Sequence, residues 1–501
     1  GQAYSDGLRF IQFYFGLPLA MVVLCVTFIP AFSRLNVYTA YEFLEKRFDG
    51  RTRLLTAFLF LLQRGLSTGV AIIAPSIILS SILGIHSDYT ILFIGGVVIL
   101  YTVYGGTKAV SHTQVLQMLV VFTALFISAA IVLRLLPGNT GIHQALKIAG
   151  SFGKTAAIDT HFDWNNKYNL WSGIIGGFFL QLSYFGTDQS QVGRYLTGRS
   201  VRESRLGLLL NGFVKLPMQF LILLTGVLVF VFYQFNTPPV FFNHAEIRLV
   251  KSGPYAEQFA QYEQKYQAAC SLKTESLHAM SEAMHSHDSR AESLAREDVR
   301  RWDEKANSAR NEALRIIRKN NAGADVNDTD YIFLHFVMSR FPHGMIGLLI
   351  AVIFLASMGS TASGLNSLAS TSVVDVYKKL IHPDAGAKKD LLVSRISTLL
   401  WGLFCVVVAF YAKSLGNLIE AVNILGSFFY GTVLGVFLVA FYLKKVQGTA
   451  VFYAALIAQI CVILAWYFNY AAFLWLNVIG CVMVMGVALL IQLMLSKRAK
   501  P

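Results

Sequence analysis

Long apolar runs separated by short polar connections dominate the chain. A helix that crosses a bilayer needs about 20 mostly apolar residues, and eleven runs approach or exceed this length. The runs are approximately 8–32, 54–83, 89–105, 109–136, 171–193, 206–235, 341–376, 392–414, 417–443, 449–468 and 472–495. This pattern predicts an all-α polytopic membrane protein.

A polar segment of mixed charge, at about 236–340, interrupts the series of runs. Within it, apolar residues recur at helical spacing in two stretches: Phe259, Tyr262, Tyr266 and Ala269, then Leu294, Val299, Trp302, Ala306 and Ala309. Two amphipathic helices folded against each other outside the membrane are the simplest interpretation. We therefore expect a first transmembrane part at 1–235, an extramembrane helical insert at 236–340 and a second transmembrane part at 341–501.

Composition agrees with a membrane protein and excludes an ordinary soluble domain. Charged residues make up 14% of the chain, against roughly 25% in soluble proteins, and the mean hydropathy is +0.54. The five cysteines show neither a disulfide framework nor zinc-ligand spacing. Nothing resembles a catalytic triad, a phosphate-binding loop or a metal cluster, so we expect no enzymatic activity and no cofactor.

The net charge of +14 indicates membrane topology rather than nucleic-acid binding, because of where the basic residues lie. They gather in alternate connections: Arg34, Lys46, Arg47, Arg51 and Arg53; Lys108; Arg194, Arg199, Arg202 and Arg205; Lys378, Lys379, Lys388, Lys389 and Arg395; Lys444 and Lys445; Lys497, Arg498 and Lys500. The opposite short loops hold only Lys147, Lys154, Lys167 and Lys413. This bias predicts a first residue outside the cell and a cytoplasmic C-terminus. We expect a multi-pass protein of the cell membrane, located in a bacterial inner membrane.

Three charged residues fall inside apolar runs, where charge is costly and usually faces a cavity or a partner. They are Arg64, Asp188 and Lys215. One interpretation is a polar substrate pocket or an ion path. The other is structural pairing of these side chains with each other or with backbone carbonyls.

Asp188 belongs to a polar stretch at 183–191 (SYFGTDQSQ) that interrupts its apolar run. Broken helices at membrane depth occur where they are buried or line a cavity, and in transporters they hold the substrate. The alternative is that the helix ends at Gly186 and the following residues form a loop. The sequence alone leaves these two possibilities equally open.

The stretch at 356–367 (ASMGSTASGLNS) is dense in small and hydroxyl residues. Small residues at four-residue spacing, here Gly359, Ser363 and Ser367, allow helices to pack closely. Hydroxyls and freed carbonyls could also supply oxygen ligands to a hard cation. Both interpretations stay open at this point.

Three stretches together resemble the sodium/solute symporter family, which includes sodium-coupled sugar, proline and sialic acid carriers. They are 39–48 (TAYEFLEKRF), 101–110 (YTVYGGTKAV) and 356–378. The resemblance covers nearly all of the chain except the polar insert. It implies a transporter bundle built as a five-plus-five inverted repeat, with extra helices outside the repeat. It also implies two helices upstream of Gly1, so that about 11 of about 13 transmembrane helices are present.

The resemblance implies a sodium site on the helix at 356–367. Ala356 and Ser360 match family positions that face the ion, whereas Gly359 stands where the family carries the first hydroxyl. Gln114 replaces an Asp that many members link to cation coupling, which puts a second cation in doubt.

For the substrate, the resemblance implies a set of side chains on several helices. Phe13 matches an outer aromatic gate, Tyr184 an inner aromatic gate, Gln181 an amide ligand and Lys215 a basic ligand of sugar hydroxyls. Tyr14 replaces a sugar-binding Glu, which puts a hexose in doubt. Arg64 lies about a turn from an Arg that pairs with a carboxylate in sialic acid carriers, and Asp188 lies on the broken stretch.

The leading expectation is therefore cation-coupled symport of a small polar solute, a sugar or an organic acid, with sodium as the coupling ion. One alternative is a transporter-like sensor or scaffold that binds a solute without moving it. Another is a carrier that is coupled to protons or not coupled at all. The lipid bilayer is the remaining partner, and no nucleic acid is expected.

Overall fold

The computed structural model describes residues 1–35, 38–105, 108–137, 140–196, 200–382, 386–412 and 417–498. Within these ranges the protein consists of helices and their connections, without a strand. Ten helical stretches are long and apolar enough to cross a membrane. They are Gln2–Arg34, Gly50–Leu83, Ser87–Tyr104, Gln117–Leu135, Val201–Phe235, His343–Leu380, Lys388–Ala412, Leu418–Tyr442, Gly448–Tyr467 and Phe473–Ser496.

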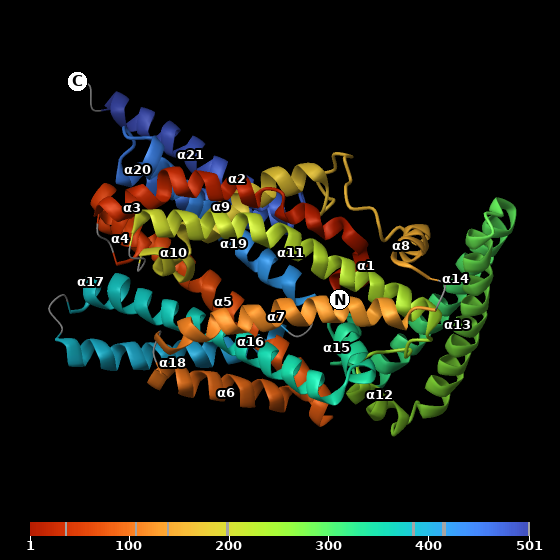
Figure 1. Cartoon of the computed structure of the whole chain (residues 1–501). Helices are drawn as coiled ribbons and strands as arrows, with labels where there is room; N and C mark the ends of the chain where they lie inside the picture. Colours follow the sequence, from red (N-terminus) through yellow and green to blue (C-terminus); the bar gives the residue numbers. More distant parts are fainter. Residues whose placement is uncertain are drawn as a thin grey trace.

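Most of these stretches are single helices that run roughly side by side (Figure 1). They are α5 (Gly50–Leu83), α6 (Ser87–Gly105), α7 (Lys108–Leu135), α11 (Val201–Phe235), α16 (His343–Thr371), α18 (Ala387–Ala412), α19 (Leu418–Tyr442), α20 (Gly448–Tyr467) and α21 (Phe473–Arg498). A π-helical segment (Ser372–Tyr377) continues α16 into α17 (Lys378–Leu380). The first stretch is composite and joins α1 (Gln2–Asp6), a 3-10 helix (Gly7–Tyr14), α2 (Leu17–Val23), a π-helical segment (Leu24–Phe28) and α3 (Ile29–Leu35).

Local sequence accounts for several helix ends. Asp49 caps α5 by accepting a hydrogen bond from the Thr52 backbone N–H, and Ser200 caps α11 in the same way. At the other end of α5, Gly84 adopts a left-handed conformation with φ of 66°, which a glycine reaches without steric cost.

The eleventh predicted run, 171–193, is absent from the ten spans because the structure breaks it into short pieces. A π-helical segment (Ser172–Gly176) leads into α9 (Gly177–Thr187), and α10 (Gln189–Leu196) follows after one extended residue. That residue is Asp188, with φ of −76° and ψ of 116°. The run is therefore a broken helix, and it continues beyond Gly186.

Glycines allow the broken helix to lie directly against the first span. A Cβ atom on Gly16 would meet the Phe178 backbone nitrogen at 2.2 Å, and one on Gly173 would meet the Gln12 carbonyl oxygen at 2.1 Å. No side chain fits at such separations, so only glycine permits this approach. Close contact between α2 and α9 places the start of the broken helix beside the first span.

Four helices at one end of the bundle form the polar segment: α12 (His244–Lys251), α13 (Ala256–His285), α14 (Ser289–Asn320) and α15 (Thr329–Arg340). The two long helices α13 and α14 form an antiparallel hairpin across this end, while the C-terminus lies at the opposite end (Figure 1). We call the first of these the hairpin end. The hairpin turns at His287, which has a positive φ of 54°, and Asp288 caps α14 by accepting from Arg290 and Ala291.

The hairpin has a hydrophobic core of its own. Its members come from both long helices, from α12 and from the preceding loop: Val240, Phe241, Val250, Phe259, Tyr266, Ala269, Cys270, Ala306, Ala309, Ala313, Ile316 and Ile317. Of the apolar positions predicted from helical spacing, Phe259, Tyr266, Ala269, Ala306 and Ala309 belong to this core, whereas Leu294 is 59% exposed. The three-part division at 235 and 340 remains a prediction from the sequence.

A buried polar network ties helices together near the opposite end. Asp375 accepts hydrogen bonds from Arg53 Nε at 2.8 Å and from Thr39 Oγ1 at 2.9 Å. Arg53 also pairs with Glu45 at 2.5 Å, and Lys379 pairs with the same carboxylate. Burial of Asp375 is tolerated because its charge is compensated by the guanidinium. These contacts hold α4 (Ala40–Arg47), α5 and the end of α16 in register.

Candidate functional site

Half of the residues predicted for the site line one cavity of about 720 Å³. These are Arg64 on α5, Tyr184 on α9, Lys215 on α11, and Ala356 and Ser360 on α16. A cavity of this size is within the range that holds small molecules in proteins. Four helices that are distant in sequence therefore direct predicted site residues toward one space.

Other residues that line the cavity come from α7, α9, α10 and the first turns of α11. They are Gln117, Met118, Val121, Phe185, Gln191, Arg194, Tyr195, Glu203, Ser204, Gly207, Leu208 and Asn211. Since α11 begins at Val201, the cavity extends from the interior toward the end of the bundle opposite the hairpin. That end is the one predicted from the basic residues to be cytoplasmic.

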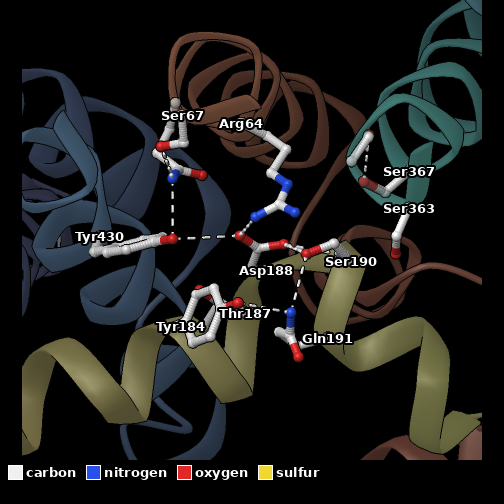
Figure 2. A network of polar contacts seen from close by, with 12 residues as sticks. Arg64, Ser67, Tyr184, Thr187, Asp188, Ser190, Gln191, Ser363, Ser367 and Tyr430 are labelled. Carbon is white, nitrogen blue, oxygen red and sulfur yellow. Dashed lines mark hydrogen bonds and ion pairs between the residues drawn. The ribbon is translucent and has the colours of Figure 1, made fainter. Parts of the chain in front are cut away.

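An ion pair between Arg64 and Asp188 lies beside the cavity (Figure 2). Arg64 Nη1 and Asp188 Oδ2 are 3.8 Å apart, and the two side chains are 12% and 0% exposed. The Tyr430 hydroxyl donates to the same carboxylate oxygen at 3.3 Å, and Gln63 Nε2 donates to that hydroxyl at 2.9 Å. The charge of Asp188 is thus shared between α5, the broken helix and α19.

The break at Asp188 follows from its side chain. Asp188 Oδ1 accepts hydrogen bonds from the Ser190 backbone N–H at 2.8 Å and from Ser190 Oγ at 2.6 Å. This is the bonding of an aspartate at the start of a helix, so the carboxylate begins α10 while its second oxygen faces Arg64. Gln191 then donates to the Tyr184 hydroxyl at 2.8 Å across the break.

Arg64 keeps hydrogen-bonding capacity that the surrounding protein does not use. Its Nε is buried and, in the described part of the chain, has no hydrogen-bond partner. The ion pair at 3.8 Å is longer than the 2.7–2.9 Å of a charge-assisted hydrogen bond. A carboxylate that entered the cavity could therefore accept from the guanidinium without replacing a saturated contact.

Lys215 faces aromatic rings rather than a carboxylate. Its ammonium lies 5.3 Å from the ring centre of Tyr14 and 5.7 Å from that of Phe185. Among the described residues it forms no ion pair. Ring faces attract a cation weakly, so a negatively charged ligand would gain from this ammonium.

The other predicted residues lie outside the cavity lining. Phe13 is buried, stacks on Phe10 with ring centres 5.4 Å apart and packs against Tyr14. The Tyr14 ring contacts the Lys215 ammonium, and Gln181 is buried in α9. Asp188 stands behind Arg64 and lines a separate cavity of about 10 Å³.

The predicted cation site has two of its three residues at the cavity. Ala356 and Ser360 are one turn apart on α16, and both line the cavity, whereas Gly359 is buried away from it. Ser360 Oγ donates to the Ser357 carbonyl at 2.9 Å, which leaves its lone pairs available to a cation. The structure does not describe the side chains of several residues named in the sequence analysis. They are Gln114, Lys108, Arg199, Lys413, Lys497, Arg498 and Lys500.

The small residues of α16 also bring this helix close to α5. A Cβ atom on Gly364 would meet Thr68 Oγ1 at 2.5 Å and Arg64 Nε at 3.4 Å. The packing interpretation of the run at 356–367 therefore holds for Gly364. Gly364 lies one turn beyond Ser360 on the same face of α16, so the close approach to α5 directly adjoins the residues predicted for the cation.

Sequence reasoning missed Tyr430 and Gln63 as partners of the central charges. Gln63 is adjacent to Arg64, the charged residue noted within this apolar run, so its polar amide could have been predicted as part of the same network. Tyr430 lies in an apolar run among other aromatic residues and gave no signal. Gln191, which bonds to Tyr184, belonged to the polar stretch that marked the break.

Comparison with known proteins supports this architecture. The model of the Sodium:solute symporter family matches residues 1–248 and 311–458, and so leaves out most of the hairpin. A solved structure titled "Substrate-bound outward-open state of a Na+-coupled sialic acid symporter reveals a novel Na+-site" aligns with a TM-score of 0.71 and 21% identity. The alignment covers 98% of this chain and 85% of that one, which shows a shared fold.

Curated relatives are sodium-coupled carriers by name. The chain is 32% identical to the sodium/iodide cotransporter of Homo sapiens over 232 residues, which are 46% of this chain and 36% of the relative. It is 24% identical to the sodium-dependent multivitamin transporter of Oryctolagus cuniculus, over 84% of this chain and 53% of the relative. The sodium-coupled monocarboxylate transporter 1 of Xenopus laevis is also 24% identical, over 87% of this chain and 57% of the relative. The chain thus spans about half the length of these relatives.

These relatives are transporters rather than enzymes, as the sequence predicted. The family model matches well over half of the chain, on both sides of the hairpin. The multi-pass helical bundle and the solved structure with the same fold agree with that match. The chain belongs to the Sodium:solute symporter family.

Proposed function

We propose that the protein is a symporter that couples entry of a small carboxylate anion to sodium by alternating access. The observation that carries this proposal is that two basic side chains, Arg64 and Lys215, line the same cavity as Tyr184, Ala356 and Ser360. Charged groups within a membrane are costly and mark substrate or ion pathways. Two cations of this kind in one cavity favour an anionic solute.

The charges around the cavity support an anion over a neutral sugar. Asp188 pairs with Arg64, and the lining also contains one further acidic residue, Glu203, and one further basic residue, Arg194, whose charges offset each other in the total. Lys215 is left without a carboxylate among the described residues. The lining therefore carries one uncompensated positive charge, which a monocarboxylate would neutralise.

Names of relatives point the same way. The iodide and monocarboxylate carriers act, by their names, on small monoanions. Tyr14 at the position of a sugar-binding Glu argues against a hexose.

Sodium is the proposed coupling ion, with Ala356, Gly359 and Ser360 as its candidate residues on α16. The backbone oxygen of Ala356 and the hydroxyl of Ser360 are hard oxygen ligands, which suit such a cation. Names of the relatives and of the solved structure include sodium. Because the ion would bind in the same cavity as the solute, its occupancy would favour solute binding there.

The test is uptake of a labelled monocarboxylate into proteoliposomes that contain the purified protein. With an inward sodium gradient we expect accumulation, and with choline in place of sodium we expect none. Lys215→Met should raise KM about 10- to 150-fold, because a hydrogen bond to a charged group is worth about 1.5–3 kcal/mol. Lys444→Met, which removes an exposed lysine from a connection, is the matched control and should leave KM unchanged.

The outcomes separate the alternatives. Binding of the anion without accumulation under any gradient would indicate a sensor or scaffold. If accumulation depends on a pH gradient and not on sodium, the coupling ion is the proton, and the rest of the proposal is unaffected. Ser360→Ala should weaken the sodium dependence, and an unchanged dependence would remove Ser360 from the cation site.

A further inference from the structure

A second cavity, of about 360 Å³, lies between the hairpin and the bundle at the hairpin end. Its walls come from α1, from the loop after α8 (Ile142–Ser151), from the end of α11, and from α13 and α14. Figure 1 shows α13 and α14 standing across the ends of these segments. The family model leaves out 249–310, the range that contains the hairpin residues lining this cavity.

Four charged side chains of the cavity wall form two ion pairs, so together they contribute no net charge. Lys273 pairs with Asp303 at 3.1 Å. Arg310 binds both oxygens of Asp328 at 2.7 Å and 2.8 Å. Arg310 also donates to the Val240 carbonyl, so its guanidinium has a structural role. These contacts fix the hairpin over the cavity.

Lys154 is the remaining cation of the wall, and among the described residues it forms no ion pair. Its ammonium donates to the Ser5 carbonyl and lies 5.2 Å from the ring centre of Phe230. Burial lowers the pKa of Lys154, while the more distant carboxylates of Asp6 and Asp303 raise it. The cavity wall therefore carries one uncompensated positive charge.

Gln234 supplies an unused acceptor in the same cavity. Gln234 is 4% exposed, and among the described residues its Oε1 has no hydrogen-bond partner. A buried polar atom without a partner costs about 1–3 kcal/mol. Phe230 and Gln234 are one turn apart on α11 and both line the cavity, so a ligand beside the Lys154 ammonium would lie within one helical turn of Gln234.

These groups define the chemistry of a ligand. The single excess charge requires a monoanion, and the amide oxygen requires a donor on the ligand, such as a hydroxyl. Phe152, Phe230 and Phe242 give apolar contact for a short carbon skeleton. We propose that the cavity under the hairpin is a second binding site for a small hydroxycarboxylate, whose carboxylate accepts from Lys154 and whose hydroxyl donates to Gln234.

This site is separate from the central cavity, and no residue lines both. It adjoins a third cavity of about 560 Å³, because Ser5, Phe152 and Lys154 line both of these spaces. The third cavity opens between α1, the loop at 152–168 and the start of α19. A hydroxycarboxylate bound at Lys154 would thus be held at the hairpin end, and this binding does not depend on the proposed transport.

The test is equilibrium dialysis of the purified full chain against labelled lactate, with the number of molecules bound per chain as the readout. We expect two molecules per wild-type chain. Lys154→Met and Gln234→Met should each lower the number to one. Lys147→Met is the matched control, since Lys147 is an exposed lysine on the neighbouring helix α8 and lines none of these cavities.

Lys215→Met separates this proposal from the proposed function, because it should remove only the molecule in the central cavity. If Lys154→Met removes a molecule and Lys215→Met does not, the second site stands and the central assignment fails. If wild-type protein and the Lys154→Met and Gln234→Met variants all bind the same number, the second site is refuted. Lys154→Gln, which keeps a polar side chain of similar length, replaces Lys154→Met if that variant loses its monodisperse elution peak.

Discussion

Arg64 and Asp188 carry opposite charges into the interior of the bundle, and each compensates the other. Moving an ion from water into a protein interior costs several kcal/mol, which is recovered only with good geometry and further hydrogen bonds. Asp188 has these bonds, from Ser190 and Tyr430, whereas Arg64 Nε has none among the described residues. The carboxylate of Asp188 is therefore held by several hydrogen bonds, whereas the Arg64 guanidinium keeps a donor that the protein does not use. Such a donor is expected where a ligand binds.

Removal of one partner should be far worse than removal of both. We expect Arg64→Gln and Asp188→Asn each to lower the free energy of unfolding by about 3–5 kcal/mol, because each leaves a buried charge uncompensated. The double variant should lose much less than the sum. Unfolding in detergent, followed by circular dichroism, measures all three variants.

An exposed pair gives the control for this comparison. Arg300 and Glu304 on α14 are 82% and 68% exposed, so Arg300→Gln should cost less than about 1 kcal/mol. Strict additivity of the two buried substitutions would show that Arg64 and Asp188 do not depend on each other.

Glycines set the spacing between neighbouring helices. A Cβ atom on Gly431 of α19 would meet the Asn477 carbonyl oxygen of α21 at 2.5 Å and that of Leu476 at 2.9 Å. A Cβ atom has a fixed position on the backbone, and the atoms that it would meet are backbone atoms too. No side-chain rotation can therefore relieve this contact. By contrast, Gly347 of α16 has no atom within 4 Å of its Cβ position.

Gly431→Ala should therefore push α19 and α21 apart. Overpacking of this kind costs about 1–3 kcal/mol, and we expect a lower Tm in detergent and a weaker contact between Tyr430 and Asp188 next to it. Gly347→Ala, the control in an open position, should leave Tm unchanged or raise it, because alanine is favoured over glycine in a helix by about 0.5–1 kcal/mol. Equal Tm values for the two variants would contradict the role assigned to Gly431.

The junction of α11, α12 and α15 contains a histidine that acid should titrate only with difficulty. Nδ1 of His335 lies 2.7 Å from the Tyr233 hydroxyl, and its ring centre lies 5.2 Å from that of His244. Burial, then the neighbouring His244 and Arg340, lowers the pKa of His335 to about 4. Since an unfolded histidine has a pKa of about 6.5, the unfolded chain binds this proton first.

Stability that depends on neutral His335 is therefore complete above about pH 6.5 and is lost as the pH falls toward about 4. We expect Tm of the wild type to decrease across this interval and that of His335→Gln to decrease less. His143→Gln, at an exposed position on α8, should behave like the wild type. An identical pH profile for wild type and His335→Gln would contradict this assignment.

At the scale of the whole molecule, the bundle has two chemically different ends. The hairpin, two cavities and the first residue lie at one end, whereas the basic connections and the C-terminus lie at the other (Figure 1). The bias of basic residues predicts that the hairpin end faces outward. In that orientation, the second site meets the external solution and the central cavity extends toward the cytoplasm.

Cysteine labelling tests this orientation. Ser286 at the tip of the hairpin and Lys444 in the α19–α20 connection are both exposed, while four of the five native cysteines are buried. A membrane-impermeant maleimide should label Ser286→Cys in intact spheroplasts, and Lys444→Cys only after permeabilisation. The reverse pattern would invert the topology, and the unsubstituted protein gives the background.

The sequence by itself determined the features that depend on short stretches of chain. The apolar runs approach or exceed the length that spans a bilayer, and the apolar repeat of the insert lies on neighbouring turns, so hydropathy and spacing suffice to predict both. Polar residues within runs were visible for the same reason. Membership of the transporter class followed from three short stretches, at 39–48, 101–110 and 356–378.

Tertiary structure alone decided which of these residues meet. The structure has a broken helix rather than a helix end at Gly186, and the Asp188 carboxylate at the break both caps α10 through Ser190 and pairs with Arg64 of another helix. Tyr430 and Gln234 gained their importance from how helices are rotated and how deeply they pack, and the 3.6-residue period of one helix does not encode its rotation against another. The cavity under the hairpin exists only because α13 and α14 fold back over the ends of α1 and α11, a contact between distant segments that no local pattern specifies.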